Sequence, residues 1–184
     1  MKIAVYGSAS GEIPEELSKK ARELGKEIAI RGHTLITGGC PGLPYEAVLG
    51  AKETGGKTIA YSPGIDINEH KEKHGFPAEG FDEFVFVPAE FEFADDPLAA
   101  RKYRNVTSTA GCDAGIIIKG AIGTLNEFTC LYDYGKKVGV FTGTGGATDL
   151  VKDIVETFKK PTKSRIVYES EPARLVERLE KLQE

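Results

Sequence analysis

The sequence predicts a three-layer α/β/α, Rossmann-like fold with a parallel sheet of about six or seven strands. Apolar runs of strand length alternate with longer segments whose apolar residues recur at helical spacing. The strand runs are apolar throughout, which is typical of a parallel sheet with helices on both faces. Glycine-rich turns follow four of these runs, as expected for tight strand-to-helix connections.

The expected elements follow from this spacing and from the start and stop signals of helices. Pro14 suits a first helical turn and Gly32 a helix end. Strands are expected at 3–6, 34–37, 58–61, 84–87, 114–118 and 138–141, with 165–168 as the candidate seventh. Helices are expected at 14–31, 43–53, 97–110, 124–134, 149–158 and 171–182.

The chain length of 184 residues fits one domain, which we place at 1–184. Residues 64–82 form an irregular insertion rich in charge, glycine and proline. A connection of that length usually carries function or is disordered, and two roles stay open for it, a lid over the site or an oligomer contact.

Composition restricts the class of protein. Lys and Arg total 24 against 28 Asp and Glu, a net charge of −4, so there is no basic excess to bind nucleic acid. No signal peptide or apolar run of membrane length is seen, and the three cysteines show no paired spacing. We therefore expect a cytoplasmic protein with reduced thiols and no membrane contact. One Met, no Trp and 28% charged residues resemble a thermophile composition.

The predicted ligand site lies at the carboxyl ends of the strands, where open parallel sheets bind ligands. Four turns there are rich in Gly, Ser and Thr, and glycines let backbone amides approach a phosphate closely. Turn geometry alone explains one such loop, but four on one edge favour a shared anion site. The candidate phosphate-binding residues are Gly7, Ser8, Gly38, Gly39, Gly42, Lys119, Gly120, Gly123, Thr124, Gly143, Thr144 and Gly145.

The segment 119–127, KGAIGTLNE, is the most specific of these features. In one interpretation Thr124 is a helix N-cap and Glu127 completes a capping box. In the other, the Glu127 carboxylate faces a ligand whose phosphate lies on the helix start. Arg104 also has two interpretations. It belongs to a solvated charged face with Arg101 and Lys102, or its planar guanidinium binds a phosphate or a nucleobase.

Other chemistries are disfavoured. Neither a GxxxxGK[ST] loop nor a GxGxxG fingerprint occurs, which argues against a nucleoside triphosphatase or an ordinary NAD enzyme. His70 and His74 have i, i+4 spacing, but their context is EHKEKH rather than HExxH, so no metal site is expected. Cys40 sits in a glycine turn and is interpreted as a pocket-lining residue with no base partner.

The pattern of Arg104-Asn105 followed by GAIGTLNE resembles the Lonely Guy (LOG) superfamily, often labelled lysine decarboxylase-like. The signature of that superfamily is an Arg, about fifteen residues, and then PGGxGTxxE. The GSASG turn and the stretch GGCPGLPYEAVLGAKETGG are also similar, so the resemblance spans nearly the whole chain. Arg-Asn and the later GTGGATD are closer to the molybdenum-cofactor carrier protein-like branch. Lys119 and Ala121 depart from the signature, which has Pro and Gly there.

The resemblance implies two alternative functions. LOG proteins are phosphoribohydrolases that cleave the N-glycosidic bond of nucleoside 5′-monophosphates, and in that case Glu127 and Arg104 would be the catalytic residues. Carrier-like members bind an anionic ligand without an assigned reaction. The substrate or bound ligand is then a nucleotide or another phosphorylated small molecule, and no further cofactor is required. The resemblance also implies a homodimer or higher homo-oligomer, with the helix after the fourth strand near the interface.

Overall fold

The computed structural model describes residues 1–183, and in that range seven parallel strands form one sheet in the order β4-β3-β2-β1-β5-β6-β7. The strands are β1 (Lys2–Gly7), β2 (Thr34–Thr37), β3 (Thr58–Tyr61), β4 (Glu83–Val85), β5 (Ala114–Ile118), β6 (Lys137–Phe141) and β7 (Arg165–Glu169). The predicted α/β/α Rossmann-like fold is therefore confirmed, and 165–168 belongs to a seventh strand.

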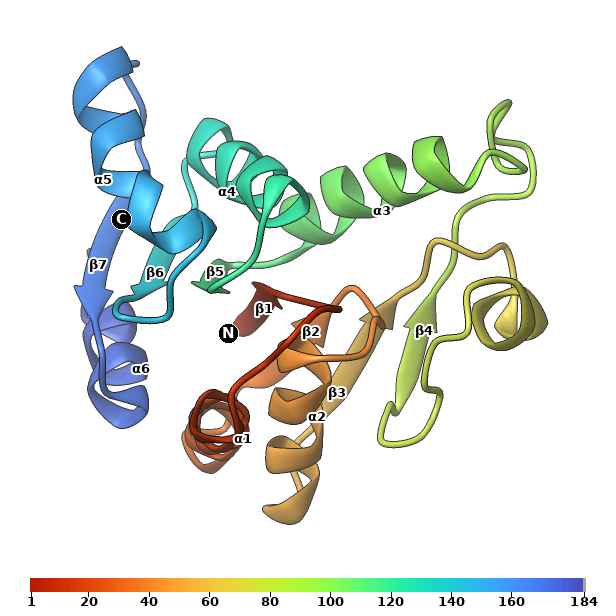
Figure 1. Cartoon of the computed structure of the whole chain (residues 1–184), viewed down its shortest axis with the longest axis horizontal. Coiled ribbons are helices and arrows are strands. Elements are labelled where there is room, and N and C mark those ends of the chain that lie inside the picture. Colours follow the sequence, from red (N-terminus) through yellow and green to blue (C-terminus); the bar gives the residue numbers. More distant parts are fainter. Residues whose placement is uncertain (184) are drawn as a thin grey trace.

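Helices cover both faces of the sheet (Figure 1). The helices are α1 (Glu15–Ile30), α2 (Leu43–Glu53), α3 (Pro97–Gly111), α4 (Ile122–Asp133), α5 (Ala147–Phe158) and α6 (Pro172–Glu180), with a short π-helix η1 (Glu69–Lys73) after β3. Helices α1, α2 and α6 pack on one face, and α3, α4 and α5 on the other. None of the helices within residues 1–183 is long and apolar enough to cross a bilayer.

The core consists of two apolar layers, one on each side of the sheet. Ile3 and Ile116 face the first layer with Leu24 of α1, whereas Ile117 faces the second with Phe128 of α4. All five side chains are almost inaccessible to solvent. Residues of β5 thus contribute to both layers in alternation, which explains why this strand is apolar along its whole length.

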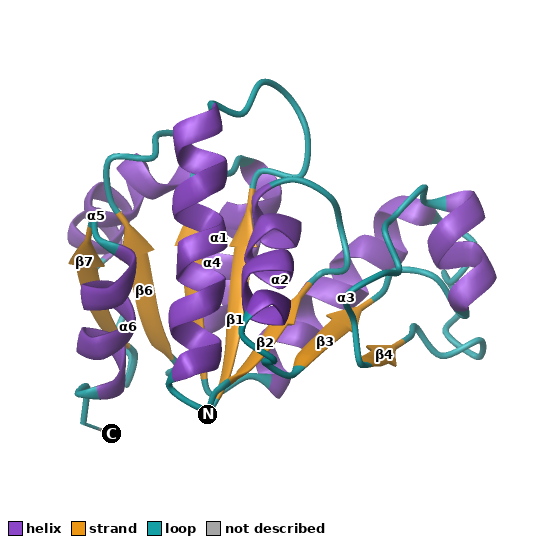
Figure 2. Ribbon diagram, turned by 90° about the horizontal axis from the view of Figure 1, so that it is seen from below, coloured by secondary structure: helices purple, strands orange, loops and turns teal. Residues whose placement is uncertain are grey.

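The topology creates a switch point beside β1. From β1 the chain builds the sheet outward through β2, β3 and β4, and α3 then carries it back across to β5 on the other side of β1 (Figure 2). The connection that leaves β1 therefore runs to one face of the sheet while that leaving β5 runs to the other. A crevice opens between such diverging connections, at the carboxyl ends of the strands.

Several elements differ from their predicted bounds, and the start of α4 is the difference that affects the site. Strand β4 spans Glu83–Val85 instead of 84–87, because it pairs only with β3 at the sheet edge. Helix α4 begins at Ile122, two residues before the predicted start at Thr124.

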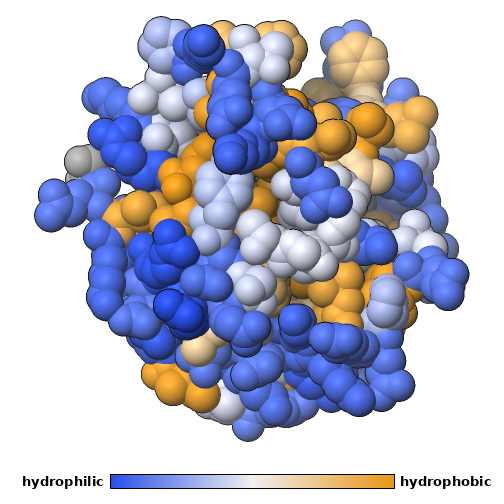
Figure 3. Space-filling view, turned by 60° about the vertical axis from the view of Figure 1, so that its left-hand side comes forward, coloured by the Kyte–Doolittle hydropathy of each residue, from blue (hydrophilic) through white to orange (hydrophobic). Residues whose placement is uncertain are grey.

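The molecular surface beside α5, β7 and α6, at the edge of the sheet away from β4, is mostly polar. Its apolar side chains gather in a few patches (Figure 3).

Candidate functional site

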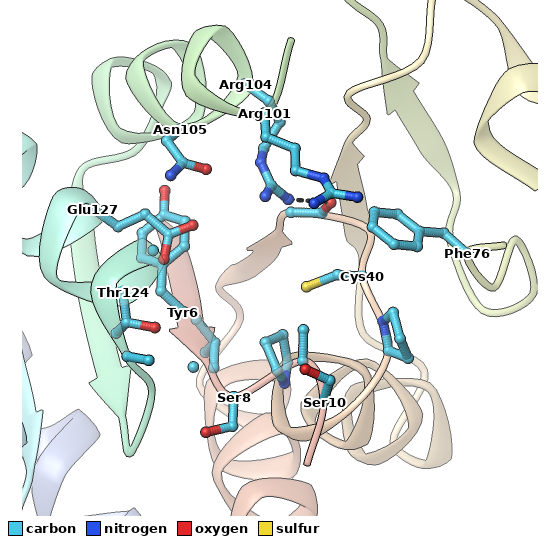
Figure 4. Close-up of a pocket in the computed structure, with 18 residues that line it drawn as sticks. Tyr6, Ser8, Ser10, Cys40, Phe76, Arg101, Arg104, Asn105, Thr124 and Glu127 are labelled. Atoms are coloured by element: carbon cyan, nitrogen blue, oxygen red, sulfur yellow. Dashed lines mark hydrogen bonds between the residues drawn. The ribbon is translucent and has the colours of Figure 1, made fainter. Parts of the chain in front are cut away.

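A pocket of about 410 Å³ lies at the carboxyl ends of β1 and β2, beside the switch point (Figure 4). The loop after β1, the loop after β2, helix α3 and the start of α4 each contribute to its walls. Its lining residues are Val5, Tyr6, Gly7, Ser8, Ala9, Ser10, Gly38, Cys40, Pro41, Pro44, Phe76, Arg101, Arg104, Asn105, Ala121, Gly123, Thr124 and Glu127.

The first turn of α4 forms one wall together with the loop after β1. Ala121 is the N-cap of the helix and provides no side-chain hydrogen bond to it. Gly123 and Thr124 lie in that first turn and line the pocket, so the positive end of the helix dipole borders it. Ser8 joins the two segments, because its Oγ accepts a hydrogen bond of 3.0 Å from the Gly120 N–H. This wall favours an anion over a cation.

Arg104 extends from α3 to the loop after β2. Its Nη1 donates to the Gly38 carbonyl oxygen at 2.5 Å, and the residue is only 8% exposed. A Cβ at position 38 would lie 1.8 Å from that Nη1, so Gly38 is the residue that lets the guanidinium approach the backbone. The Nε of Arg104 is buried and has no partner among the described residues. The guanidinium is therefore held in place while part of its donor capacity stays unused.

Glu127 lies on α4 with its side chain directed at the pocket (Figure 4). The residue is 7% exposed, and within residues 1–183 its carboxylate has neither a hydrogen bond nor an ion pair. Burial raises the pKa of the Glu127 carboxyl to about 7, even though the Arg104 and Lys102 cations act in the opposite direction. A carboxyl group with such a pKa exchanges protons near neutral pH.

The capping-box interpretation of Thr124 and Glu127 is wrong. Because α4 begins at Ile122, Thr124 is the third residue of the helix rather than its N-cap. Glu127 is then a full turn too far along the helix to reach back to the cap. This shift releases the carboxylate from a local structural role and leaves it directed at the pocket.

A second set of polar groups lies beneath the pocket. The Tyr6 hydroxyl donates to Ser108 Oγ at 3.1 Å, and burial raises the pKa of this phenol well above its usual value. Asn105 donates through Nδ2 to Asn126 Oδ1 at 3.0 Å, which fixes the orientation of the amide. Its Oδ1 is buried and unpartnered within the described chain. These groups give the pocket a preformed polar floor.

The structure brings about half of the predicted site residues to the pocket. Arg104, Glu127, Gly7, Ser8, Gly38, Gly123 and Thr124 line it, and so does Cys40. Predicted residues outside the lining are Gly39, Gly42, Lys119, Gly120, Gly143, Thr144 and Gly145.

The residues outside the lining shape the loops that form it. Gly42 has φ +79°, and a Cβ there would lie 2.3 Å from the Ser8 carbonyl oxygen. Lys119 adopts φ +52°, a left-handed conformation unusual for a residue with a side chain, and its N–H donates to Thr144 Oγ1 at 2.8 Å. Ala121, which stands where the LOG signature has a glycine, has φ −136°. The loop thus accommodates Ala121 by placing the left-handed turn at Lys119 and Gly120.

Tyr6, Ser10 and Phe76 are among the lining residues that the sequence analysis did not identify as candidates. Tyr6 belongs to an apolar strand and looks like any core residue, while Phe76 lies in the insertion and has no periodicity to place it. Ser10 sits in the GSASG turn, where it could have been chosen alongside Ser8.

The two histidines of the insertion do not form a metal cluster. His70 is fully buried, with Nδ1 at 2.9 Å from Ser62 Oγ and Nε2 at 2.9 Å from the Pro77 carbonyl oxygen. Burial lowers the pKa of both His70 and His74. Across residues 1–183, His, Cys, Asp and Glu side chains form no group of three or more that could hold a metal ion.

Comparison with known proteins shows which family the chain belongs to. The model of the SLOG cluster4 family matches residues 1–176. The chain belongs to the SLOG cluster4 family. An uncharacterised protein of Archaeoglobus fulgidus is 33% identical over 138 residues, which are 75% of this chain and 78% of that protein. The resemblance to the LOG superfamily is thus confirmed at the level of the family.

Solved structures share the fold of this SLOG protein. The X-ray structure of TM1055 has a TM-score of 0.80 and 22% identity, covering 98% of this chain and 99% of that one. The molybdenum cofactor binding protein of the phototrophic bacterium Rippkaea orientalis has a TM-score of 0.69 and 19% identity, covering 97% and 94%. These likenesses extend along nearly the whole chain and show a shared fold.

Proposed function

We propose that this protein binds a nucleotide or a similar phosphorylated small molecule in the pocket, with the phosphate against the loop after β1 and the first turn of α4. The helix dipole, the glycines of both segments and the Ser8 and Thr124 hydroxyls favour an anion there. Arg104 adds a fixed positive charge beside Gly38. The pocket is also large enough for a small cofactor or nucleotide.

We further propose that the protein hydrolyses the N-glycosidic bond of nucleoside 5′-monophosphates. The observation that carries this proposal is the buried, unpaired carboxylate of Glu127 facing the same pocket. Cleavage of such a bond develops positive charge on the sugar, and a nearby carboxylate stabilises it. The base leaves with the bonding electron pair and takes up a proton from solvent. The proton that Glu127 receives in the next step returns to solvent, so the enzyme ends unchanged. Water then adds its oxygen to C1′ and gives a proton to Glu127, which yields free base and ribose 5-phosphate.

Arg104 has a supporting role in this scheme. Because its Nη1 is bound to the Gly38 carbonyl oxygen, the guanidinium is oriented before a ligand arrives. The remaining donors can bind the phosphate or an acceptor on the departing base. No further cofactor takes part in any of these steps.

The test is incubation of the purified protein with AMP and CMP, followed by chromatography of the free base. Wild-type protein is expected to release base, and Glu127→Gln, which keeps the size of the side chain, to be slowed about 100-fold or more while still binding AMP. Base release by Glu127→Gln at the wild-type rate would contradict the catalytic assignment. Binding without release of base by the wild type would contradict the hydrolase proposal but not the ligand site.

A second function, non-catalytic binding or carriage of a phosphorylated cofactor, is supported by a specific observation. The fold likeness includes a molybdenum cofactor binding protein, and Lys119 and Ala121 replace the Pro and Gly of the hydrolase signature. Under this alternative the Glu127 carboxyl acts only as a polar contact for the ligand. Mass spectrometry of small molecules released from the denatured protein separates the two functions, because a carrier should retain a stoichiometric cofactor.

The homodimer implied by the family resemblance is proposed to use helix α3. Two of its apolar side chains are exposed, Leu98 at 70% and Val106 at 42%. Pairing of two chains through α3 would remove these two side chains from water. Light scattering should give the mass of two or more chains, and Leu98→Glu together with Val106→Glu should reduce it to that of one. An unchanged mass in the double variant would place the interface elsewhere.

A further inference from the structure

We propose that Phe76, in the insertion after β3, is an aromatic platform that stacks on a planar heteroaromatic ring of the ligand. The inference rests on the proposed function, because it assumes that a phosphorylated ligand occupies the pocket. It assigns a role to residues 64–82 and narrows the ligand class to phosphorylated molecules that carry a flat ring.

Phe76 lies at the end of the pocket away from the proposed phosphate wall. Figure 4 shows its ring across the pocket from Glu127 and Thr124, with Cys40 on the same side. A ligand with its phosphate on the first turn of α4 and its sugar beside Glu127 would therefore extend its third part toward Phe76. In a nucleoside monophosphate that third part is the base.

The local structure holds the Phe76 ring in place. The Phe76 N–H donates to the His70 carbonyl oxygen at 3.1 Å. Its ring centre is 5.7 Å from that of His70, nearly perpendicular at 82°, and 5.6 Å from that of His74. His70 is itself buried and hydrogen-bonded to Ser62 and to the Pro77 carbonyl. A ring fixed before the ligand arrives loses little conformational freedom on binding.

The surroundings of the ring suit a flat aromatic group. Pro41, Pro44 and Cys40 provide apolar contact on the side of the loop after β2, and the exposed Arg101 of α3 also lines this end. Stacking on an aromatic side chain accepts any base, since every base has a π-face. A sugar phosphate without a ring gains nothing from this end of the pocket. Nucleobases and pterins share the required flat, heteroaromatic ring.

The experiment compares ligands with and without the ring, by isothermal titration calorimetry. The probes are AMP, a pterin monophosphate and ribose 5-phosphate. The variants are Phe76→Leu, which keeps apolar bulk but has no π-face, and Phe76→Tyr, which restores the ring. Phe158→Leu is the matched control, because Phe158 is 74% exposed at the end of α5 and does not line the pocket.

We expect Phe76→Leu to lower the affinity for the ring-bearing ligand about tenfold or more. The affinity for ribose 5-phosphate should stay within about twofold of that of the wild type. Phe76→Tyr should bind like the wild type, and so should Phe158→Leu. The tighter of AMP and the pterin monophosphate identifies the source of the ring.

Equal weakening of all probes by Phe76→Leu would overturn the inference in favour of a structural role, and so would no change for either ring-bearing ligand. Either result would still be compatible with a phosphate site in the wild-type protein. If wild-type protein binds none of the three probes, the proposed function fails and the inference falls with it.

Discussion

The loops after β5 and β6 have similar sequences but different positions relative to the pocket. Both are rich in Gly and Thr, and each precedes a helix of 12 residues. The first brings Gly123, Thr124 and Glu127 to the pocket, whereas no residue of the second lines it. Instead Thr144 accepts the Lys119 N–H, and the Ala147 N–H donates to the Gly120 carbonyl oxygen at 3.0 Å. The loop after β6 supports the loop that forms the site.

The difference follows from strand order rather than from loop composition. Strand β5 adjoins β1, where the connections diverge to opposite faces, while β6 is one strand further out. Only a loop beside the switch point borders the crevice. A glycine-rich loop one strand further away can instead support the loop that lines the crevice. The glycine content of a loop does not show which of these two roles it has.

The largest expected effect is a change of the free energy of unfolding with pH. It is expected for Glu127, the sixth residue of α4, but not for Lys152, the sixth residue of α5. The folded state holds the pKa of Glu127 near 7, above its ordinary value of 4.5. The native protein therefore binds the proton more tightly than the unfolded chain does, and the associated stability, roughly 3 kcal/mol, is present below pH 4.5 and lost as the pH rises to about 7. Denaturant titrations between pH 4 and 8 should show this loss in the wild type but not in Glu127→Gln.

Lys152→Gln is the matched control, because Lys152 is exposed and its one ion pair among residues 1–183, with Glu156, is long at 3.9 Å. Its pH profile should follow that of the wild type. If the free energy of unfolding of Glu127→Gln keeps the full pH dependence of the wild type, burial of the Glu127 carboxyl is not its cause.

The next prediction compares alanine substitutions at two glycines that have the same left-handed backbone conformation. Gly120 and Gly145 have φ +78° and +79°, so an alanine costs about 1 kcal/mol of stability at either position. Only at Gly120 would the new Cβ collide with Thr124, 2.1 Å from its Oγ1. Gly120→Ala should weaken AMP binding about tenfold or more, as measured by calorimetry, and Gly145→Ala should leave it unchanged. Equal losses of affinity would remove the distinction between the two loops.

The smallest effect compares Thr124 with Thr144, each changed to valine. Thr124 lines the pocket, so Thr124→Val should reduce affinity for ribose 5-phosphate about fivefold through the loss of one hydrogen bond. Thr144→Val leaves the Lys119 N–H without its acceptor and should lower the free energy of unfolding by about 1–2 kcal/mol. Thermal or denaturant unfolding together with titration separates these outcomes. A loss of affinity confined to Thr144→Val would reverse the proposed roles.

The sequence predicted the layers of the fold and the residues nearest the switch point. Apolar periodicity located the strands and helices, and the glycine turns indicated the edge of the sheet where the pocket lies. The sequence did not predict the order of the strands in the sheet. It therefore could not show that the loop after β5 lines the pocket while the loop after β6 does not. The start of α4 was misplaced because Thr124 imitates an N-cap, although the chain enters the helix through the left-handed Lys119 and Gly120. Phe76 packs against His70 and His74 in an irregular insertion, and such a segment has no apolar periodicity from which its position could be predicted.

The central claim is that a phosphorylated ligand binds between the loop after β1 and the first turn of α4. A crystal structure of the protein soaked with AMP tests it most directly. We expect the phosphate within hydrogen-bonding distance of the backbone amides of residues 122–124, with the sugar beside Glu127. Phosphate bound instead in the basic hollow at the other end of the strands, beside Lys136, Lys137, Lys163 and Arg165, would contradict it.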